Sequence, residues 1–219
     1  MKRISTNWQI RLFLLGWIIL LKLVMKLPYN FMAFNVFLAY VPIELGFQLR
    51  HFADRRSLAF WVLLILWVVF YPNAPYVMTD LFHLAWLHPH TSISGILRSD
   101  PHTWLMFSLM VISAFACALF GAISLLQTSR LLTMMTTPRH LQWRLVWISC
   151  CSFISSVGIY IGRFLRLHSL YILMTPGWFI KQLLRMWNAE MIQFVIILTI
   201  TQLILVYLIH VIAGYPVDD

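Results

Sequence analysis

The chain of 219 residues contains six stretches that stay apolar over about the length of a membrane-spanning helix, which needs about 20 mostly apolar residues. The predicted spans cover residues 9–28, 31–49, 58–82, 102–128, 143–162 and 190–213. Because 61% of the residues are apolar and only 11% are charged, we expect lipid and not water to surround the chain. The predicted fold class is therefore all-α: a polytopic transmembrane helical bundle in which residues 1–219 form a single integral membrane domain.

One further apolar segment, YILMTPGWFIKQLL at 171–184, is too short and too interrupted to cross a bilayer. We expect it to lie in the membrane interface as an amphipathic segment, or to enter the membrane and return on the same side.

The formal net charge of +9 comes from bases that stand in short clusters between the apolar runs. No nucleic-acid-binding motif accompanies them, so membrane lipids, and not nucleic acid, are the expected partners, with other membrane subunits as further candidates. The N-terminal segment and the loops at 50–57 and 129–144 hold nine Lys and Arg, against six on the opposite side. Loops rich in these residues stay in the cytoplasm, which predicts that both termini are cytoplasmic.

The third span ends in FYPNAPYVMTDLFHL, residues 70–84, where prolines and polar side chains follow an apolar run. Pro72 and Pro75 each lack a backbone donor, so we expect helical hydrogen bonding to be lost around residues 71–74. Asn73 and Thr79 are placed to satisfy some of the carbonyls that this break frees. The third helix is therefore predicted to be broken, with polar backbone groups near its end.

Two ionisable residues follow the break, Asp80 and His83, and their spacing places them on one face if the helix resumes. A carboxylate and an imidazole so placed suit acid–base chemistry, cation binding or a simple mutual hydrogen bond. The alternative is a kinked helix with polar residues at the interface. An ionisable group at membrane depth costs about 2.5–3.5 kcal/mol on insertion scales, which favours a functional role.

A second polar motif, GIYIGRFLRLHS at 158–169, ends the fifth span. Arg163 and Arg166 are three apart, so on an α-helix they share a face, with His168 just beyond. Arginine suits phosphate or carboxylate groups, although arginines that only anchor a helix end are the alternative. Both motifs end on the extracytoplasmic side of the predicted topology, so we expect them to form one ligand-binding site. Its predicted residues are Asn73, Tyr76, Asp80, His83, Arg163, Arg166 and His168.

Glu44 is an isolated acid within the second span. A glutamate at this depth is expected to be partnered or protonated, and Arg50 or Lys22 are candidate partners. A structural ion pair is favoured over a role in transport.

Small residues recur at helical spacing in two spans: Gly158 with Gly162, and Ser113 with Cys117 and Gly121. Such stripes let helices approach closely, so we interpret both as packing surfaces.

Neither a metal nor a cofactor is predicted. His88, His90 and His102 lie loosely near Asp80 and Asp100 without the spacing of a zinc site. Motifs of a nucleophilic serine, a P-loop or a dinucleotide site are also missing from the sequence, so it indicates no particular reaction.

Three segments in this order resemble a family of bacterial multi-pass membrane proteins known as domain of unknown function 1361: NVFLAYVP at 35–42, residues 70–84, and residues 158–169. Other members have a Trp-Tyr/Phe-Asp element before the fourth span. The corresponding HTWLMFSLM, residues 102–110, lacks that aspartate. The resemblance implies a helical bundle in a bacterial cell membrane and no established activity.

The function predicted is that of an integral membrane protein whose extracytoplasmic polar pocket binds an anionic or zwitterionic ligand. A lipid headgroup, an envelope precursor and a small metabolite all fit that description. A transport role would need a partner to supply energy, because the chain has no ATPase motif. The alternatives are an intramembrane enzyme acting on a lipid-linked substrate, with Asp80 or His83 as the base, and a structural or assembly subunit of a membrane complex.

Overall fold

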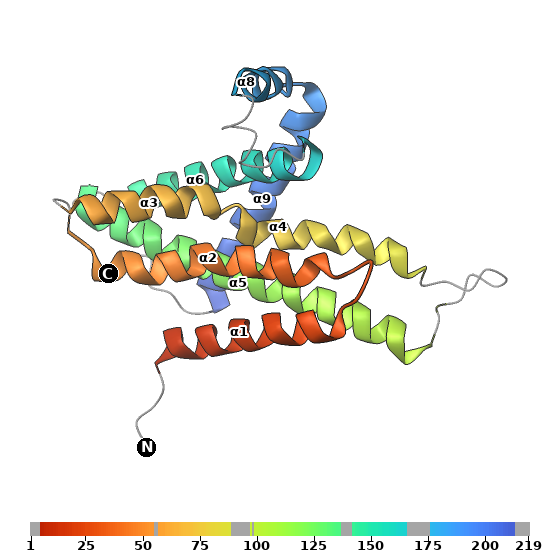
Figure 1. Cartoon of the computed structure of the whole chain (residues 1–219). Coiled ribbons are helices and arrows are strands. Elements are labelled where there is room, and N and C mark those ends of the chain that lie inside the picture. The colour runs from red at the N-terminus through yellow and green to blue at the C-terminus, as the bar shows by residue number, and fades with distance from the viewer. Residues whose placement is uncertain are drawn as a thin grey trace. The chain divides into compact units, whose positions relative to one another are not determined.

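The computed structural model describes residues 5–54, 57–88, 97, 99–136, 142–165 and 176–212, and the elements in these residues are all helices (Figure 1). The elements are α1 (Thr6–Val24), α2 (Phe31–His51), α3 (Leu58–Phe70), α4 (Asn73–Thr79), η1 (Asp80–Leu87), α5 (Pro101–Thr136), α6 (Trp143–Tyr160), η2 (Ile161–Leu165), α8 (Pro176–Arg185) and α9 (Ala189–Ile212).

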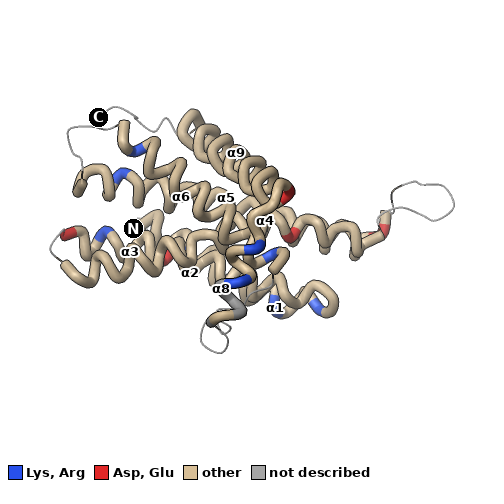
Figure 2. The backbone as a smooth tube through the Cα atoms, turned by 90° about the horizontal axis from the view of Figure 1, so that it is seen from above, with Lys and Arg blue, Asp and Glu red and all other residues tan. Residues whose placement is uncertain are grey.

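Six helical segments of the described chain are long and apolar enough to cross a bilayer, which confirms the predicted all-α fold and the predicted number of spans. Four of them are single helices, α1, α2, α5 and α9. The third span combines α3, α4 and η1, and the fifth combines α6 and η2. Figure 2 shows long stretches of these helices without a charged residue, as a lipid environment requires.

Two compact units make up the chain, Met1–Ser124 and Leu125–Asp219. The first unit contains α1 to η1 and the first part of α5. The second contains the end of α5 and the helices that follow it.

Helix α5 is longer than the predicted span at 102–128. Its 36 residues rise about 54 Å, against about 30 Å for the hydrocarbon core of a bilayer. Arg130, predicted to lie in a loop, is therefore part of the helix. Arg144, predicted in the same loop, lies in the first turn of α6, where it is buried and donates to the carbonyl of Leu126 at 3.4 Å. The connection between these two spans is shorter than the sequence indicated.

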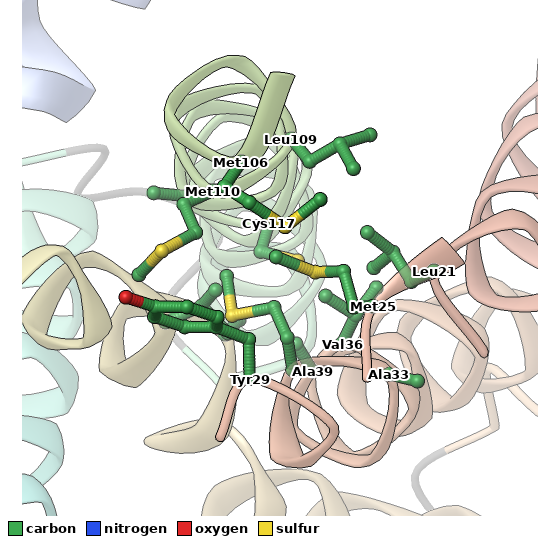
Figure 3. Close-up of a cluster of buried hydrophobic side chains, with 14 residues drawn as sticks. Leu21, Met25, Tyr29, Ala33, Val36, Ala39, Met106, Leu109, Met110 and Cys117 are labelled. Atoms are coloured by element: carbon green, nitrogen blue, oxygen red, sulfur yellow. The ribbon is translucent and has the colours of Figure 1, made fainter. Parts of the chain in front are cut away.

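The core of the first unit is a cluster of buried side chains from α1, α2, α4 and α5 and from the connection between α1 and α2 (Figure 3). Sulfur-containing side chains recur in it: Met25, Met32, Met106, Met110 and Cys117. Methionine is flexible and fills irregular gaps, which suits a core where several helix ends meet. This packing holds α2 and α4 beside α5.

A buried hydrogen-bond chain joins α2, α3 and α5 deeper in the same unit. The indole Nε1 of Trp67 donates to Oγ of Ser124 at 3.0 Å, and Ser124 Oγ lies 3.4 Å from the carbonyl oxygen of Pro42, to which it donates. Gly46 faces the same serine, and a Cβ at that position would collide with Ser124 Oγ. A larger residue there would force Ser124 Oγ to move and would disturb its hydrogen bond with Trp67.

The break in the third span is narrower than predicted. Helix α3 ends at Phe70 and α4 begins at Asn73, so only Tyr71 and Pro72 lie outside helices. Pro75 is the third residue of α4, where a backbone N–H would lack a partner within the helix in any case. The prolines therefore start a new helix and do not unravel the old one.

The small-residue stripe on α5 packs as predicted. Ser113 is buried and accepts a hydrogen bond from Trp17 Nε1 at 2.9 Å, and Cys117 is also buried. At Gly121, an added methyl group would lie 2.6 Å from Cβ of Ala74, which leaves no room between α4 and α5. The stripe thus fixes the position of α4, which leads directly into Asp80.

In the second unit, α6 packs along α9, and buried Met186, Met191 and Val195 form a small apolar cluster against the end of α6 and η2. Helix α8 covers residues 176–185 of the segment predicted to be interfacial or re-entrant, and residues 171–175 lie outside the described chain. With 10 residues it rises about 15 Å, too little to span a bilayer. Its place at the interface stays a prediction.

Candidate functional site

Asp80 stands at the junction between α4 and η1, and its side chain is fully buried. The amide Nδ2 of Asn35, on α2, donates to Asp80 Oδ2 at 2.7 Å. A hydrogen bond to a carboxylate is stronger than one between neutral groups, so this contact ties the end of the third span to α2.

His83 lies one turn after Asp80. Because η1 is a 3₁₀-helix, with three residues per turn, side chains three apart lie directly in line. His83 Nδ1 is 3.8 Å from Asp80 Oδ1 and 3.0 Å from the main-chain oxygen of Asp80. The predicted alignment of the two residues is confirmed, on a tighter helix than the α-helix expected.

Two aromatic rings lie against this imidazole, and a third lies near one of them. The ring centroids of Phe31 and His83 are 4.7 Å apart, those of His83 and Trp86 4.3 Å, and those of Tyr29 and Trp86 6.2 Å. At these separations the rings are in contact or close to it. We call these residues the Asp80 cluster: Tyr29, Phe31, Asn35, Asp80, His83 and Trp86.

Tyr29, whose ring lies near that of Trp86, carries an unsatisfied polar group. Its side chain is 6% exposed, and its hydroxyl has no hydrogen-bond partner among the described residues. The hydroxyl points away from Leu21 (Figure 3). Burial raises the pKa of Tyr29, so the phenol stays protonated and able to donate. A buried hydroxyl without a partner calls for a water or a ligand group.

Asn73 and Thr79 act as the sequence suggested, on carbonyls near the helix break. Asn73 Nδ2 donates to the carbonyl of Phe70 at 2.8 Å, and Thr79 Oγ1 donates to that of Tyr76 at 2.7 Å. Of the predicted site residues in the first unit, Asp80 and His83 are brought together. The amide of Asn73 is used locally, and the side chain of Tyr76 is half-buried on α4.

The remaining predicted site residues belong to the second unit. Arg163 lies in η2, a turn of π-helix, whereas Arg166 and His168 fall outside the described residues. The α-helical spacing that put both arginines on one face does not apply to Arg163, because the α-helix ends at Tyr160. Single π-helical turns occur frequently at functional sites.

Sequence reasoning missed Asn35, Phe31, Trp86 and Tyr29. For Asn35 a signal was present, because an amide in an otherwise apolar span needs a hydrogen-bonding partner on another helix. The aromatic residues gave no comparable signal, since aromatic residues are common throughout this chain.

Glu44 forms a polar cluster of its own in the first unit. Arg11 on α1 holds it through two parallel hydrogen bonds, Nε to Oε2 at 2.7 Å and Nη2 to Oε1 at 2.8 Å. Tyr40 and Gln48 donate to the same carboxylate at 3.0 and 2.6 Å. The predicted ion pair is confirmed, but neither Arg50 nor Lys22 is the basic partner identified, since Arg11 takes that place.

Within the part of the chain that the structure describes, no group of three or more His, Cys, Asp and Glu residues is arranged to hold a metal ion. His90, one of the three loop histidines considered for such a site, is outside that part.

Six apolar helical segments and a buried carboxyl group beside a partly exposed imidazole define the class, a multi-span helical membrane protein with a polar centre at the end of one span. A family model described as "Protein of unknown function (DUF1361)" matches residues 34–205, so the chain belongs to this family. The match covers the three segments that carried the resemblance. No curated protein and no solved structure matches the chain.

Proposed function

We propose that the protein is a multi-pass protein of the bacterial cell membrane that binds a zwitterionic ligand through the Asp80 cluster, on the extracytoplasmic side. The observation that carries the proposal is the burial of Asp80 next to Asn35 and His83. A carboxylate taken out of water costs several kcal/mol unless other groups compensate, so a chain that serves only as a scaffold gains little from one.

The chemistry of the Asp80 cluster favours an ammonium group as the part of the ligand that binds there. A carboxylate attracts a cation and repels an anion, and the faces of Phe31 and Trp86 add cation–π attraction. The unpartnered hydroxyl of Tyr29 supplies a further hydrogen bond. Among the anionic and zwitterionic ligands that the sequence suggests, a zwitterion with an ammonium group, such as an ethanolamine headgroup, fits best.

The side of the membrane follows from the charge distribution. With both termini cytoplasmic, as the basic loops predict, the third span runs outward and the Asp80 cluster lies toward the extracytoplasmic leaflet. The part that Arg163, Arg166 and His168 take in binding stays a prediction from the sequence. A role in transport would require an energy-supplying partner among other membrane subunits.

Ligand-dependent stability tests the proposal. A ligand at about 100 times its Kd stabilises a protein by about 2.7 kcal/mol, so adding phosphatidylethanolamine to the purified protein is expected to raise its melting temperature more than adding phosphatidylglycerol does. Asp80→Asn is expected to abolish that difference because the amide keeps the shape and removes the charge. Native mass spectrometry of the same samples would identify a ligand that co-purifies.

Phe82→Ala is the matched control, since Phe82 lies on η1 beside Asp80 but is 81% exposed. It should retain the response to phosphatidylethanolamine. An Asp80→Asn variant that responds like the wild type would contradict the proposed site. An Asp80→Asn variant that fails to fold would instead favour the structural role.

An enzyme acting on a lipid-linked substrate is the second candidate, and the contact at His83 favours it. When Nδ1 carries the proton it donates to the main-chain oxygen of Asp80, which leaves Nε2 unprotonated and able to act as a base. Comparison of lipid extracts from cells carrying the wild type or His83→Gln would reveal a product that only the wild type forms.

A further inference from the structure

The second unit has a polar interior where α6 meets α9. Three serines of α6 are almost completely buried, namely Ser152, Ser155 and Ser156, and so is Gln202 of α9. Ser152 is near the middle of α6, which has 18 residues, and Gln202 is near the middle of α9, which has 24. These side chains therefore lie far from both ends of their spans.

Part of their hydrogen-bonding capacity is used between the two helices. Thr199 Oγ1 donates to Ser156 Oγ at 3.0 Å, and Gln202 Nε2 donates to the same oxygen at 2.9 Å. Ser156 in turn donates to the main-chain oxygen of Ser152 at 2.9 Å, and Gln202 Nε2 lies 3.3 Å from that oxygen. Interhelical hydrogen bonds of this kind contribute to helix association in membranes.

Three polar atoms of this group remain without a hydrogen-bond partner among the described residues: Ser152 Oγ, Ser155 Oγ and Gln202 Oε1. Turning the Gln202 amide over would exchange an unpaired acceptor for an unpaired donor, so the group would still be incomplete. Buried polar atoms in proteins are nearly always paired, and inside a membrane each unpaired atom is costly. Helix association alone does not explain the three open positions.

We propose that Ser152, Ser155, Ser156, Thr199 and Gln202, which we call the α6–α9 seam, bind a hydroxyl group in the interior of the membrane. One hydroxyl group can accept hydrogen bonds from Ser152 and Ser155 and donate its proton to Gln202 Oε1, so a single occupant has the capacity to satisfy all three atoms. A buried water makes about three such bonds. The occupant is either water itself or the hydroxyl group of a polyol.

The charge distribution argues for a neutral occupant. Within the described residues of α6 and α9 the only acid is Glu190, in the first turn of α9 and 12 positions before Gln202. A cation in the seam would therefore lack a carboxylate to offset its loss of hydration. The seam lies in the second unit and involves no residue of the Asp80 cluster, so this proposal stands apart from the proposed function.

Exchange of a thiol hydrogen in D2O tests the seam, because D2O is a probe of the same size as water. In a background with Cys117, Cys150 and Cys151 replaced by alanine, Ser152→Cys and Ser155→Cys each place one thiol in the seam. Infrared spectroscopy of the protein in liposomes then follows conversion of S–H to S–D. We expect exchange at least about tenfold faster than at Ile154→Cys, a 49% exposed position of the same turn that faces away from the seam.

Glycerol distinguishes the two sources of the hydroxyl group. If a polyol occupies the seam, glycerol shifts the S–H band of Ser152→Cys, whereas it leaves the band unchanged if the occupant is water. Exchange at both serine positions as slow as at Ile154→Cys, in variants that elute as folded protein, would overturn the proposal. The two single variants are independent, so misfolding of one does not prevent the test.

Discussion

Replacing Arg11 with methionine is expected to destabilise the protein by about 2 kcal/mol. The ion pair is part-buried, with the Arg11 and Glu44 side chains 16% and 27% exposed, so the cost falls between the roughly 0–1 kcal/mol contributed by a typical exposed pair and the about 3–5 kcal/mol of removing one partner from a fully buried pair. The variant loses two of the four hydrogen bonds that hold the carboxylate, and Tyr40 and Gln48 do not replace the lost charge. Thermal unfolding in detergent, followed by tryptophan fluorescence, measures the loss.

A second substitution separates charge from packing. Adding Glu44→Gln to Arg11→Met removes the stranded charge and should recover most of the stability. Arg11 also stacks on the rings of Trp8 and Phe47, with its guanidinium carbon 5.0 and 5.3 Å from their centroids. If Glu44→Gln brings no recovery, the cost arises from this packing and the stranded charge is not its cause.

Arg50 and Lys22 provide the matched controls, because both are exposed bases of the same two helices and were the partners expected from the sequence. Arg50→Met and Lys22→Met should each change stability by less than about 0.5 kcal/mol. An effect as large as that of Arg11→Met at either position would contradict the pairing in the structure.

The basic partner of Glu44 could not be predicted from the sequence, although the spans could. The six spans were predictable because each is apolar over its own length, a local property. The partner of Glu44 depends instead on how two helices pair. Because α1 and α2 follow each other through a short connection and pack together, the beginning of α1 lies beside the end of α2, which brings Arg11 to Glu44 across 33 positions.

The length of α5 was missed for a related reason. Gln127, Thr128, Ser129 and Arg130 lower the hydropathy, so the predicted span ended there, yet backbone hydrogen bonding continues the helix to Thr136. Thr128 and Ser129 are buried, with Ser129 Oγ donating to the carbonyl of Leu126 at 2.9 Å. Hydropathy predicts which part of a helix faces lipid. It does not predict how far the helix continues when its polar residues are buried against the rest of the protein.

In the candidate site, too, local contacts were predictable from the sequence and contacts between helices were not. The alignment of Asp80 with His83 was predictable from a spacing of three residues, whereas the hydrogen bond from Asn35 joins positions 45 apart. The serines of α6 likewise gave no signal by themselves, because their burial and their contact with Gln202 appear only when α6 packs against α9. Residues that act locally were identified, and those that act through another helix required the structure.

Replacing Gly121 with alanine is expected to destabilise the protein by about 2 kcal/mol, within the 1–3 kcal/mol typical of an overpacked interior. The added methyl group would lie 2.6 Å from Cβ of Ala74, and the next nearest atoms are the Ala74 backbone at 3.8 and 4.0 Å. No flexible side chain is present to move aside, so α4 and α5 must separate. Since α4 leads into Asp80, the variant should also weaken the response to phosphatidylethanolamine.

Gly16 gives the control for the substitution itself, because a Cβ there has no atom within 4 Å. Gly16→Ala should leave stability unchanged or raise it by up to about 1 kcal/mol, since alanine is the better helix former. Ala74→Gly combined with Gly121→Ala removes the opposing methyl group and should restore most of the loss, leaving only the cost of glycine within α4. If Gly121→Ala is as stable as Gly16→Ala in the same detergent, α4 and α5 do not approach as closely as described. If Ala74→Gly fails to restore Gly121→Ala, the contact between these two positions is not the origin of the loss.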